Sequence, residues 1–412
     1  MELLENAVRP YAWGSRTAIA ALLGRPVPAP HPEAELWLGA HPADPSRLVR
    51  PDGTELSLLD LVEADPAGQL GVACAQRWAG RLPFLLKVLA ADEPLSLQAH
   101  PSAEQARQGF AAEEAAGIPL DAKNRNYRDP NHKPELVCAL TEFHALAGFR
   151  DPHRTIELLR CLDAPELAGY AELLVAQPDS AGLRALFTTW ITLPQLTLDA
   201  LLPSLLDACV LHVKEHGPFE VECKTVLELG EAYPGDAGVL AALLLNRFVL
   251  QPGEAIYLPA GNLHAYLSGT AVEIMANSDN VLRGGLTPKH VDVPELLRVL
   301  DFSAGDVPVL RGERHREHVT TYHTPAEEFL LSTVAWPAGD SAPVELAEGR
   351  PQIVLCTDGA VHVSLAGQAQ TRLGRGGSLW LPASDPVATL RPEDGESAQV
   401  FVATPGGTPF NT

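Results

Sequence analysis

Cysteine and methionine are scarce in this chain of 412 residues, which has six cysteines and two methionines. The cysteines are scattered, and no two of them form a C-x-x-C pair. A disulfide framework or a thiolate zinc site is therefore not expected, and a metal should rest on histidine, carboxylate and amide donors. We expect buried free thiols at Cys74, Cys138, Cys161, Cys209, Cys223 and Cys356.

Basic residues are also few, because 30 Lys and Arg stand against 52 Asp and Glu, for a net charge of −22. This balance argues against a nucleic-acid partner but allows a small anionic substrate in a local basic pocket. No apolar run reaches the roughly 18 residues that span a bilayer, so no membrane partner is expected. The stretch MELLENAVRPYAWGS has no basic segment followed by an apolar one, so we expect a cytoplasmic protein. We also expect a monomer.

The residues that are present predict a mainly β protein with a helical insertion. At this length, with 46% hydrophobic residues, two or three domains are expected. Short β-like runs lie at 35–42, 46–50 and 82–90, separated by proline and glycine, and a segment at 57–79 looks helical. Such strands are typical of a β-barrel or sandwich.

Further along, the character of the chain changes twice. Ser102 with Gln105 predicts a capping box that opens a helix, and Gly117 predicts its end. Residues 133–149 alternate as a strand does, whereas 151–248 carry apolar residues at helical spacing. Strand character then returns at 248–276 and, after a short helix near 293–301, continues to the C-terminus.

An internal repeat links the two β-rich parts. PGEAIYLPAGNLH (252–264) aligns without gaps with RGGSLWLPASDPV (375–387), and each copy predicts a turn, a strand and a tight proline turn. His264 aligns with Val387. If His264 is a metal ligand, the second copy has lost it, so residues 310–412 are expected to form a related barrel without a metal.

Four residues could form a metal site: Gln98, His100, Glu135 and His264. Side chains two apart on a strand share a face, which directs Gln98 and His100 to one point. Nitrogen and oxygen donors of this kind suit zinc with an open position for water or substrate. Each residue alone has an ordinary explanation, such as a core histidine or a surface glutamate, and only their joint occurrence favours a site.

Several cations could receive an anionic substrate beside that site. Lys133 is two residues before Glu135 and hence on the same strand face. Arg283 lies in the turn-rich segment NSDNVLRGGLTPKH, whose glycines allow close backbone approach. Lys87 and Lys289 are further candidates, although a single lysine is most often only a solvated side chain.

Six longer segments together resemble type I phosphomannose isomerase, from residue 11 to about 302. They are YAWGS (11–15), AELWLGAHP (34–42), LPFLLKVLAADEPLSLQAHPS (82–102), NHKPELVCALTEFHALAGF (131–149), LPAGNLHAYLSG (258–269) and EIMANSDNVLRGGLTPKH (273–290). The resemblance covers the helical block only loosely and the last 110 residues hardly at all.

The resemblance implies an enzyme with one Zn²⁺ per chain that interconverts mannose 6-phosphate and fructose 6-phosphate. By motif position, the metal ligands of that family fall on Gln98, His100, Glu135 and His264. Its active-site arginine, lysine and glutamate fall on Arg283, Lys133 and Glu273, and pocket positions fall on Ser96, Tyr266 and Trp13.

The fold implied has two cupin-type β-barrels (jelly rolls) and a helical domain. Residues 1–150 and 249–309 are then the catalytic cupin domain, 151–248 the helical domain, and 310–412 a cupin-like domain without metal.

Isomerisation through a cis-enediol moves a proton between C1 and C2, so a developing oxyanion must be stabilised and a general base is needed. Arg283 and the metal suit the first task, and Glu273, Lys133 and His41 are candidates for the second. Lys87, Lys289 and Ser96 are candidates for binding the phosphate.

Two other functions stay open from the residues alone. A metal-dependent cupin of the dioxygenase class usually binds iron through two or three histidines with few cations nearby. A non-enzymatic sugar-binding cupin does not need a metal with convergent cations. The mixed Gln, Glu and His set beside Lys133 and Arg283 fits phosphosugar isomerisation better, and metal analysis with a coupled assay separates the three.

Overall fold

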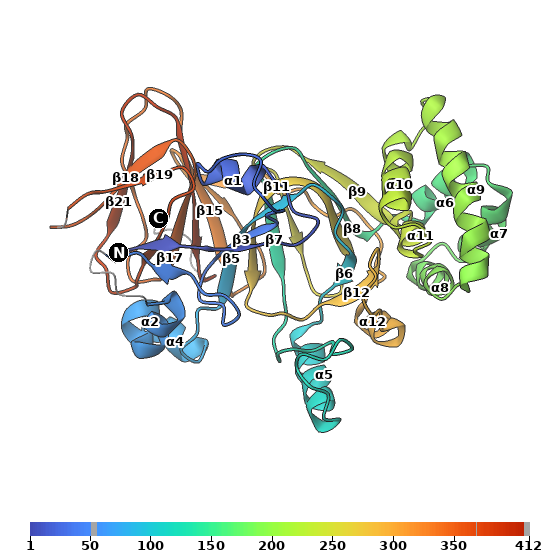
Figure 1. Cartoon of the computed structure of the whole chain (residues 1–412), viewed down its shortest axis with the longest axis horizontal. Helices are drawn as coiled ribbons and strands as arrows, with labels where there is room; N and C mark the ends of the chain where they lie inside the picture. The colour runs from blue at the N-terminus through green and yellow to red at the C-terminus, as the bar shows by residue number, and fades with distance from the viewer. Residues whose placement is uncertain (51–55, 368, 408–412) are drawn as a thin grey trace.

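The computed structural model describes residues 1–50, 56–367 and 369–407. The molecule is elongated: strands from the C-terminal part lie at one end, a second group of strands lies in the middle, and a bundle of helices lies at the other end (Figure 1). All pairings between its named strands are antiparallel. This arrangement agrees with the predicted mainly β chain with a helical insertion.

The central group is a ten-stranded sheet. Its strands are β2 (Ala7–Arg9), β3 (Glu35–Leu38), β5 (Phe84–Ala91), β6 (Leu97–Ala99), β7 (Glu135–Ala139), β8 (Phe143–Phe149), β9 (Leu245–Leu250), β10 (Ala255–Leu258), β11 (His264–Ala276) and β12 (Leu282–Gly285). Strand β11 organises the sheet, because its second half pairs with β5 and β7 while its first half pairs with β6 and β8. The stretch predicted as one strand at 133–149 is two strands, β7 and β8, which pair in succession with the second and the first half of β11.

The strands of the C-terminal part form an eight-stranded and a four-stranded sheet. They are β13 (Glu313–Arg316), β14 (Val319–Tyr322), β15 (Leu330–Trp336), β16 (Val344–Glu345), β17 (Gln352–Asp358), β18 (Ala360–Leu365), β19 (Thr371–Gly374), β20 (Ser378–Leu381), β21 (Ala388–Pro392) and β22 (Ala398–Thr404). The eight-stranded sheet also contains β1 (Glu2–Glu5) and β4 (Arg47–Leu48), and β1 pairs with β20. The start of the chain is thus built into the C-terminal sheet.

The internal repeat corresponds to equivalent local structure. The aligned strand segments are β10 and β20, and the glycines aligned before them, Gly253 and Gly376, both have a positive φ, +86° and +79°. An L-residue pays a steric penalty for that backbone conformation, so glycine fits the turn in both copies. The predicted turn followed by a strand is confirmed in each copy.

The helices at the far end of the molecule are consecutive in the chain. They are α6 (Pro152–Cys161), α7 (Pro165–Ala176), α8 (Ser180–Ile191), α9 (Gln195–Lys214), α10 (Glu220–Ala232) and α11 (Gly238–Ala242). Asp151 and Asp179 accept hydrogen bonds from backbone N–H groups at the starts of α6 and α8, which satisfies donors that a helix end leaves free. The helical prediction for 151–248 is wrong only near its end, where Leu245–Leu250 is strand β9, paired with β8.

Among the described residues, only α9 is long and apolar enough, by length and composition, to cross a membrane; its mean hydropathy reaches 1.5. The helix is not an uninterrupted apolar run, because Asp199 and Asp207 lie within it. Leu198, Leu202 and Leu205 of α9 belong to the core that the helices share, and Pro203 lies inside the helix. The same test is passed by helices that pack on a protein core, and one such helix is weak evidence for a membrane span.

The other helices lie outside the run from α6 to α11. They are α1 (Ala18–Leu22), α2 (Leu58–Ala64), α3 (Pro66–Leu70), α4 (Val72–Arg77), α5 (Ala103–Ala115) and α12 (Val293–Val299). The predicted helical segment at 57–79 is three helices, which break at Asp65 and Gly71. At α5 the predicted capping box is confirmed, since Ser102 and Gln105 exchange side-chain to backbone hydrogen bonds.

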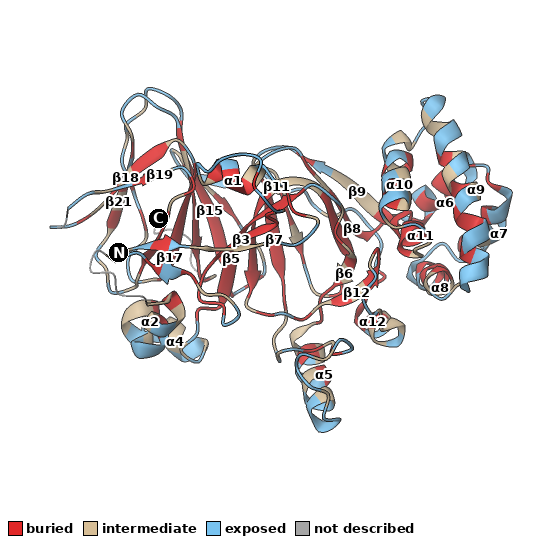
Figure 2. Ribbon diagram, in the orientation of Figure 1, coloured by how far each residue is buried: buried red, intermediate tan, exposed pale blue. Residues whose placement is uncertain are grey.

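Buried residues lie along most strands of the three sheets and on the inner faces of the helices (Figure 2). One core cluster joins the central sheet to the C-terminal sheet and includes Phe84, Leu355 and Phe401, while another joins the helices to β8, β11 and β12. Burying one such large apolar side chain contributes about 1.5–3 kcal/mol. All six cysteines are free thiols, and all but Cys74 and Cys161 are buried.

Candidate metal centre

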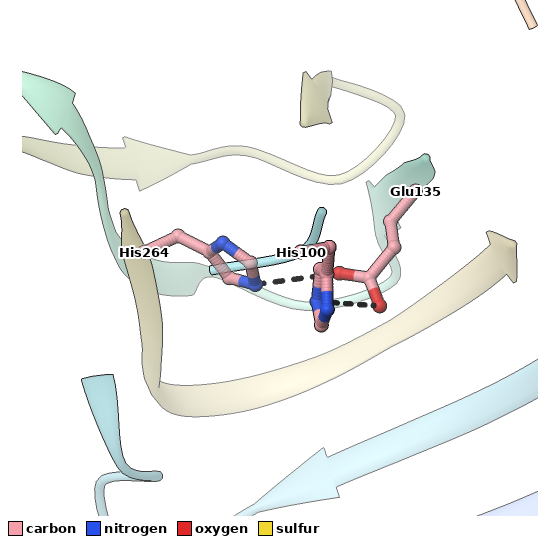
Figure 3. Close-up of side chains that lie close together, drawn as sticks. All are labelled: His100, Glu135 and His264. Atoms are coloured by element: carbon pink, nitrogen blue, oxygen red, sulfur yellow. Dashed lines mark ion pairs between the residues drawn. The ribbon is translucent and has the colours of Figure 1, made fainter. Parts of the chain in front are cut away.

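Three of the four predicted ligands converge inside the central sheet. His100 follows β6, Glu135 begins β7 and His264 begins β11, and each is at most 1% exposed. Their ligand atoms all lie within 4.8 Å of one another. Figure 3 shows both imidazole rings directed at the Glu135 carboxylate, with His100 on one oxygen and His264 on the other.

Backbone hydrogen bonds determine which nitrogen of each ring is free. His100 Nδ1 lies 2.7 Å from the carbonyl oxygen of Asn280, and His264 Nδ1 lies 3.0 Å from that of Asn262. A carbonyl oxygen only accepts, so each Nδ1 carries the hydrogen and each Nε2 carries a lone pair. Metal-ligating histidines are oriented in this way by outer hydrogen bonds.

The lone pairs of the two buried Nε2 atoms therefore face the Glu135 carboxylate, which is itself a hydrogen-bond acceptor. Among the residues that the structure describes, neither Nε2 has a hydrogen-bond partner, and both point to the Glu135 carboxylate. Burying polar atoms without partners is unfavourable, and a cation among the three acceptors removes that penalty. The donor set, two imidazoles and a carboxylate, is one that catalytic zinc sites use.

The spacing fits a single small metal ion. His100 Nε2 lies 3.4 Å from Glu135 Oε1, and His264 Nε2 lies 3.3 Å from Glu135 Oε2. Two donors bound at about 2.0–2.1 Å to one tetrahedral zinc ion are about 3.3 Å apart. The side chains thus have the separations of zinc ligands.

A neighbouring lysine sets the charge of the group. Lys133 Nζ lies 2.8 Å from Glu135 Oε1, as expected for two residues on one strand face. Burial on its own raises the pKa of Glu135, but Lys133 and the two histidines together lower it well below its usual value. Burial and then the charge of Lys133 lower the pKa of His100 to about 4, so its ring is neutral at pH 7 and can ligate.

Gln98 lies in a row with two other predicted site residues. It is half-buried on β6, opposite His264 of β11 on one side and Arg283 of β12 on the other. Directly opposite residues on paired strands point their side chains to the same face. The register therefore brings Gln98, His264 and Arg283 to one face of the sheet.

A chain of buried polar side chains extends from Glu135 into the sheet. The Tyr266 hydroxyl lies 3.5 Å from Glu135 Oε2 and donates to Glu273 Oε1 at 2.9 Å. Glu273 Oε2 lies 3.1 Å from Lys87 Nζ, which is 3.7 Å from Glu35 Oε1. Burial raises the pKa of Glu273, and the carboxyl group is therefore closer to proton exchange at neutral pH than an exposed one.

Sequence reasoning missed Glu35 and Trp37, which complete this chain. Trp37 Nε1 donates to Glu35 Oε2 at 2.7 Å, and the Trp37 ring lies under Lys87 Nζ at 5.4 Å. Both are on β3, which pairs with β5. A signal was present in ELWL, where a glutamate and a tryptophan alternate with leucines on a buried strand.

The remaining cations lie together at the edge of the site. Burial lowers the pKa of Arg283, and the charge of Arg128 lowers it further. The exposed Lys289 also has a pKa lowered by burial first and then by Arg283 and Arg128. Within the part of the chain that the structure describes, none of the three forms an ion pair with a carboxylate. Arg128, which sequence reasoning missed, thus joins Arg283 and Lys289 in a cationic cluster.

The other predicted residues have different surroundings. His41 is buried edge-on against Trp37, with Nε2 3.5 Å from Asp279, and burial lowers its pKa. Trp13 is half-buried against the cluster that contains Tyr266. Ser96 is half-buried just before β6.

Comparison with known proteins gives one consistent family. The sequence model of one protein family, the type I phosphomannose isomerase catalytic domain, matches residues 1–152. The mannose-6-phosphate isomerase of Escherichia coli strain K12 is 39% identical over 407 residues, which are 97% of this chain and 99% of that protein. The human mannose-6-phosphate isomerase is 32% identical over 93% of this chain and 94% of that protein.

Solved structures extend the likeness to the whole fold. A crystal structure of a phosphomannose isomerase variant from Salmonella typhimurium superposes with a TM-score of 0.89 at 35% identity, over 99% of this chain and 100% of that one. A zinc-bound holo structure of mannose 6-phosphate isomerase superposes with a TM-score of 0.89 at 35% identity, over 98% and 99%.

Proposed function

This chain is an isomerase of the mannose-6-phosphate isomerase family, and we propose that it interconverts mannose 6-phosphate and fructose 6-phosphate at a zinc site. The observation that carries the proposal is the convergence of His100, Glu135 and His264, whose free acceptors face one point inside the sheet. The comparisons and this donor set support zinc over other ions.

For the architecture, we propose two cupin-type barrels and a helical domain. Residues 1–150 with 249–309 form the catalytic barrel, 151–248 the helical domain, and 310–412 the second barrel. The strand-and-turn repeat at 252–264 and 375–387 and the consecutive helices α6 to α11 support this division. The pairing of β1 with β20 adds residues 2–5 to the second barrel.

His100, Glu135 and His264 would hold the zinc, with Gln98 as the fourth ligand. Bound there, zinc acts as a Lewis acid toward substrate oxygens. Gln98 qualifies because it lies opposite His264 in the strand register and is half-buried, so its amide oxygen can reach toward the same face. Asn280 and Asn262 keep the two imidazoles in the ligating tautomer through their carbonyl oxygens.

The cluster of Arg128, Arg283 and Lys289 binds the phosphate. Burial first, and then the charges of Arg283 and Arg128, lower the pKa of Lys289, and a phosphate dianion relieves the repulsion among these three cations. Arg283 has a second task because it lies in one row with Gln98 and His264. From there its guanidinium stabilises the oxyanion of the cis-enediol.

Glu273 is the proposed general base that moves the proton between C1 and C2. Its pKa is raised by burial, and its two oxygens contact an acid on each side, Tyr266 and Lys87, so a proton can be accepted and returned. Lys133, paired with Glu135 at 2.8 Å, is assigned instead to donating hydrogen bonds to substrate oxygens. His41 contacts Asp279 and Trp37, and we assign it, with Trp13 and Ser96, to substrate binding.

The two other functions considered from the sequence are not favoured. The relatives that match almost the whole chain are isomerases, and this finding does not favour a dioxygenase or a non-enzymatic sugar-binding cupin.

A coupled assay for fructose 6-phosphate, with mannose 6-phosphate as substrate, tests the proposal directly. We expect turnover that a chelator abolishes and added Zn²⁺ restores. Turnover that persists after complete removal of metal would rule out the zinc site, and no turnover by zinc-loaded protein would rule out the substrate.

A further inference from the structure

A second group of metal-binding side chains lies on the C-terminal part of the molecule. Glu313, His315 and His323 are exposed, and their ligand atoms lie within 4.8 Å of one another. They belong to β13 and to the residue after β14, at the free edge of the eight-stranded sheet. None of the three belongs to the site described above, which is on the central sheet.

An irregularity in the strands brings these side chains together. The pairing of β13 with β14 shifts by one residue between Arg314 and Arg316, so His315 is an extra residue on the edge strand. Such bulges redirect a side chain and are frequent beside functional sites. The bulge allows His315 to meet His323 edge-to-face, with ring centroids 5.1 Å apart.

The donors and their distances suit one divalent ion. His315 Nε2 lies 2.8 Å from His323 Nε2, and His323 Nε2 lies 3.7 Å from Glu313 Oε2. Donors to one tetrahedral zinc are about 3.3 Å apart, so shifts of about 0.5 Å bring both pairs to that spacing. Exposed side chains make such shifts easily. Two imidazoles and one carboxylate favour borderline cations over Ca²⁺ or Mg²⁺, which prefer oxygen.

We propose that Glu313, His315 and His323 form a second, surface site for a borderline divalent cation of the Zn²⁺ or Ni²⁺ class. Water completes the coordination, and the affinity is lower than that of the buried centre because the exposed side chains must be ordered on binding. The bound ion links the edge strand β13 to the end of β14 and so stabilises the folded protein. This site is independent of the isomerase reaction.

Equilibrium dialysis of the full chain against a graded series of free Zn²⁺, with the bound metal counted, tests the proposal. We expect the wild-type protein to bind a first equivalent tightly and a second more weakly. His315→Ala and His323→Ala should keep the first equivalent and full isomerase activity. Even residues outside a ligand set change metal affinity by about 10–100-fold, so loss of a ligand should weaken the second equivalent at least as much.

A histidine elsewhere on the surface provides the control. His153→Ala, at the start of α6, removes an exposed imidazole outside both groups and should leave two equivalents. If the wild-type protein binds only one equivalent, the two histidines are merely a hydrogen-bonded pair and the proposal is wrong. A second equivalent that survives in both alanine variants lies elsewhere and equally overturns it. Loss of the first, tightly bound equivalent would instead contradict the buried zinc site. The His264→Ala variant tests that site alone.

Discussion

Lys87 and Glu273 lie directly opposite each other on the paired strands β5 and β11, and their charged atoms are 3.1 Å apart inside the sheet. Burial lowers the pKa of Lys87, but the charges of Glu35 and Glu273 outweigh that effect and raise it. The lysine therefore stays protonated and compensates two buried carboxylates. Removing one partner of such a buried pair is strongly unfavourable, because the remaining charge keeps its desolvation penalty.

We accordingly expect Lys87→Met to lower the free energy of unfolding by about 3–5 kcal/mol. Denaturant titration followed by circular dichroism measures this loss. Lys123→Met, at an exposed lysine, serves as the control and should change stability by less than about 0.5 kcal/mol.

The double variant Lys87→Met with Glu273→Gln distinguishes charge from packing. It removes one of the two carboxylates that the single variant leaves without a cation, so part of the lost stability should return. If the double variant is no more stable than Lys87→Met, the stabilising effect of Lys87 comes from packing and not from its charge.

Local features of the fold were predictable because their causes lie within a few residues. The capping box at Ser102 and the repeated turn-and-strand at Gly253 and Gly376 depend on neighbours in the chain. The pairing of β1 with β20 joins residues almost 380 positions apart, and no local pattern encodes it. Residues 245–247 misled for a related reason, since they directly follow the apolar run at 238–244, and such a run fits a buried helix or a buried strand equally well.

The same contrast applies to the site. The convergence of His100, Glu135 and His264 was predicted from motifs, and the structure brings them within 4.8 Å. Glu35 and Arg128 were missed because their importance comes from side chains that are distant in sequence. Glu35 matters only beside Lys87, and Arg128 only beside Arg283.

His264→Ala should remove the metal and the activity together. One of three converging ligands is lost, and the remaining His100 and Glu135 do not close a tetrahedral site. Metal analysis of the purified variant beside the coupled assay measures both. His144→Ala, a half-buried histidine paired with Glu142 on the same sheet, is the matched control and should keep both. Full zinc content in His264→Ala would contradict the ligand assignment.

The turn before His264 offers a test of how the site is positioned. Gly261 has φ +79°, its N–H donates to the carbonyl oxygen of His100, and its carbonyl accepts from Asp301. A Cβ at Gly261 would lie 3.0 Å from backbone atoms of Val299 and Asp301. Gly261→Ala must therefore move the segment that links two ligands, and we expect weaker zinc binding as well as lower stability.

Gly253→Ala isolates the conformational part of that effect. Gly253 has φ +86° but no atom within 4 Å of a Cβ, so only the left-handed backbone is penalised, by about 1–2 kcal/mol. Thermal unfolding and zinc titration of both variants separate the contributions. Equal zinc affinity in the two would mean that the turn at Gly261 does not position His100 and His264.

The cationic cluster should divide its effects between turnover and substrate binding. Arg283 lies opposite Gln98 in the row that contains His264, whereas Arg128 is an exposed residue whose charge acts on Arg283. The Arg283→Ala variant should fold and bind zinc. Its kcat should nevertheless fall about 100-fold or more, because the substitution removes a group that stabilises developing charge. Arg128→Ala should instead raise KM about tenfold with kcat nearly unchanged, since it removes one charged contact of about 1.5 kcal/mol to the phosphate.

Steady-state kinetics of both variants, with the exposed Arg160→Ala as control, measure how the effects divide between kcat and KM. If Arg283→Ala changes only KM, its guanidinium binds phosphate alone, and stabilisation of the oxyanion then falls to Lys133 and the metal.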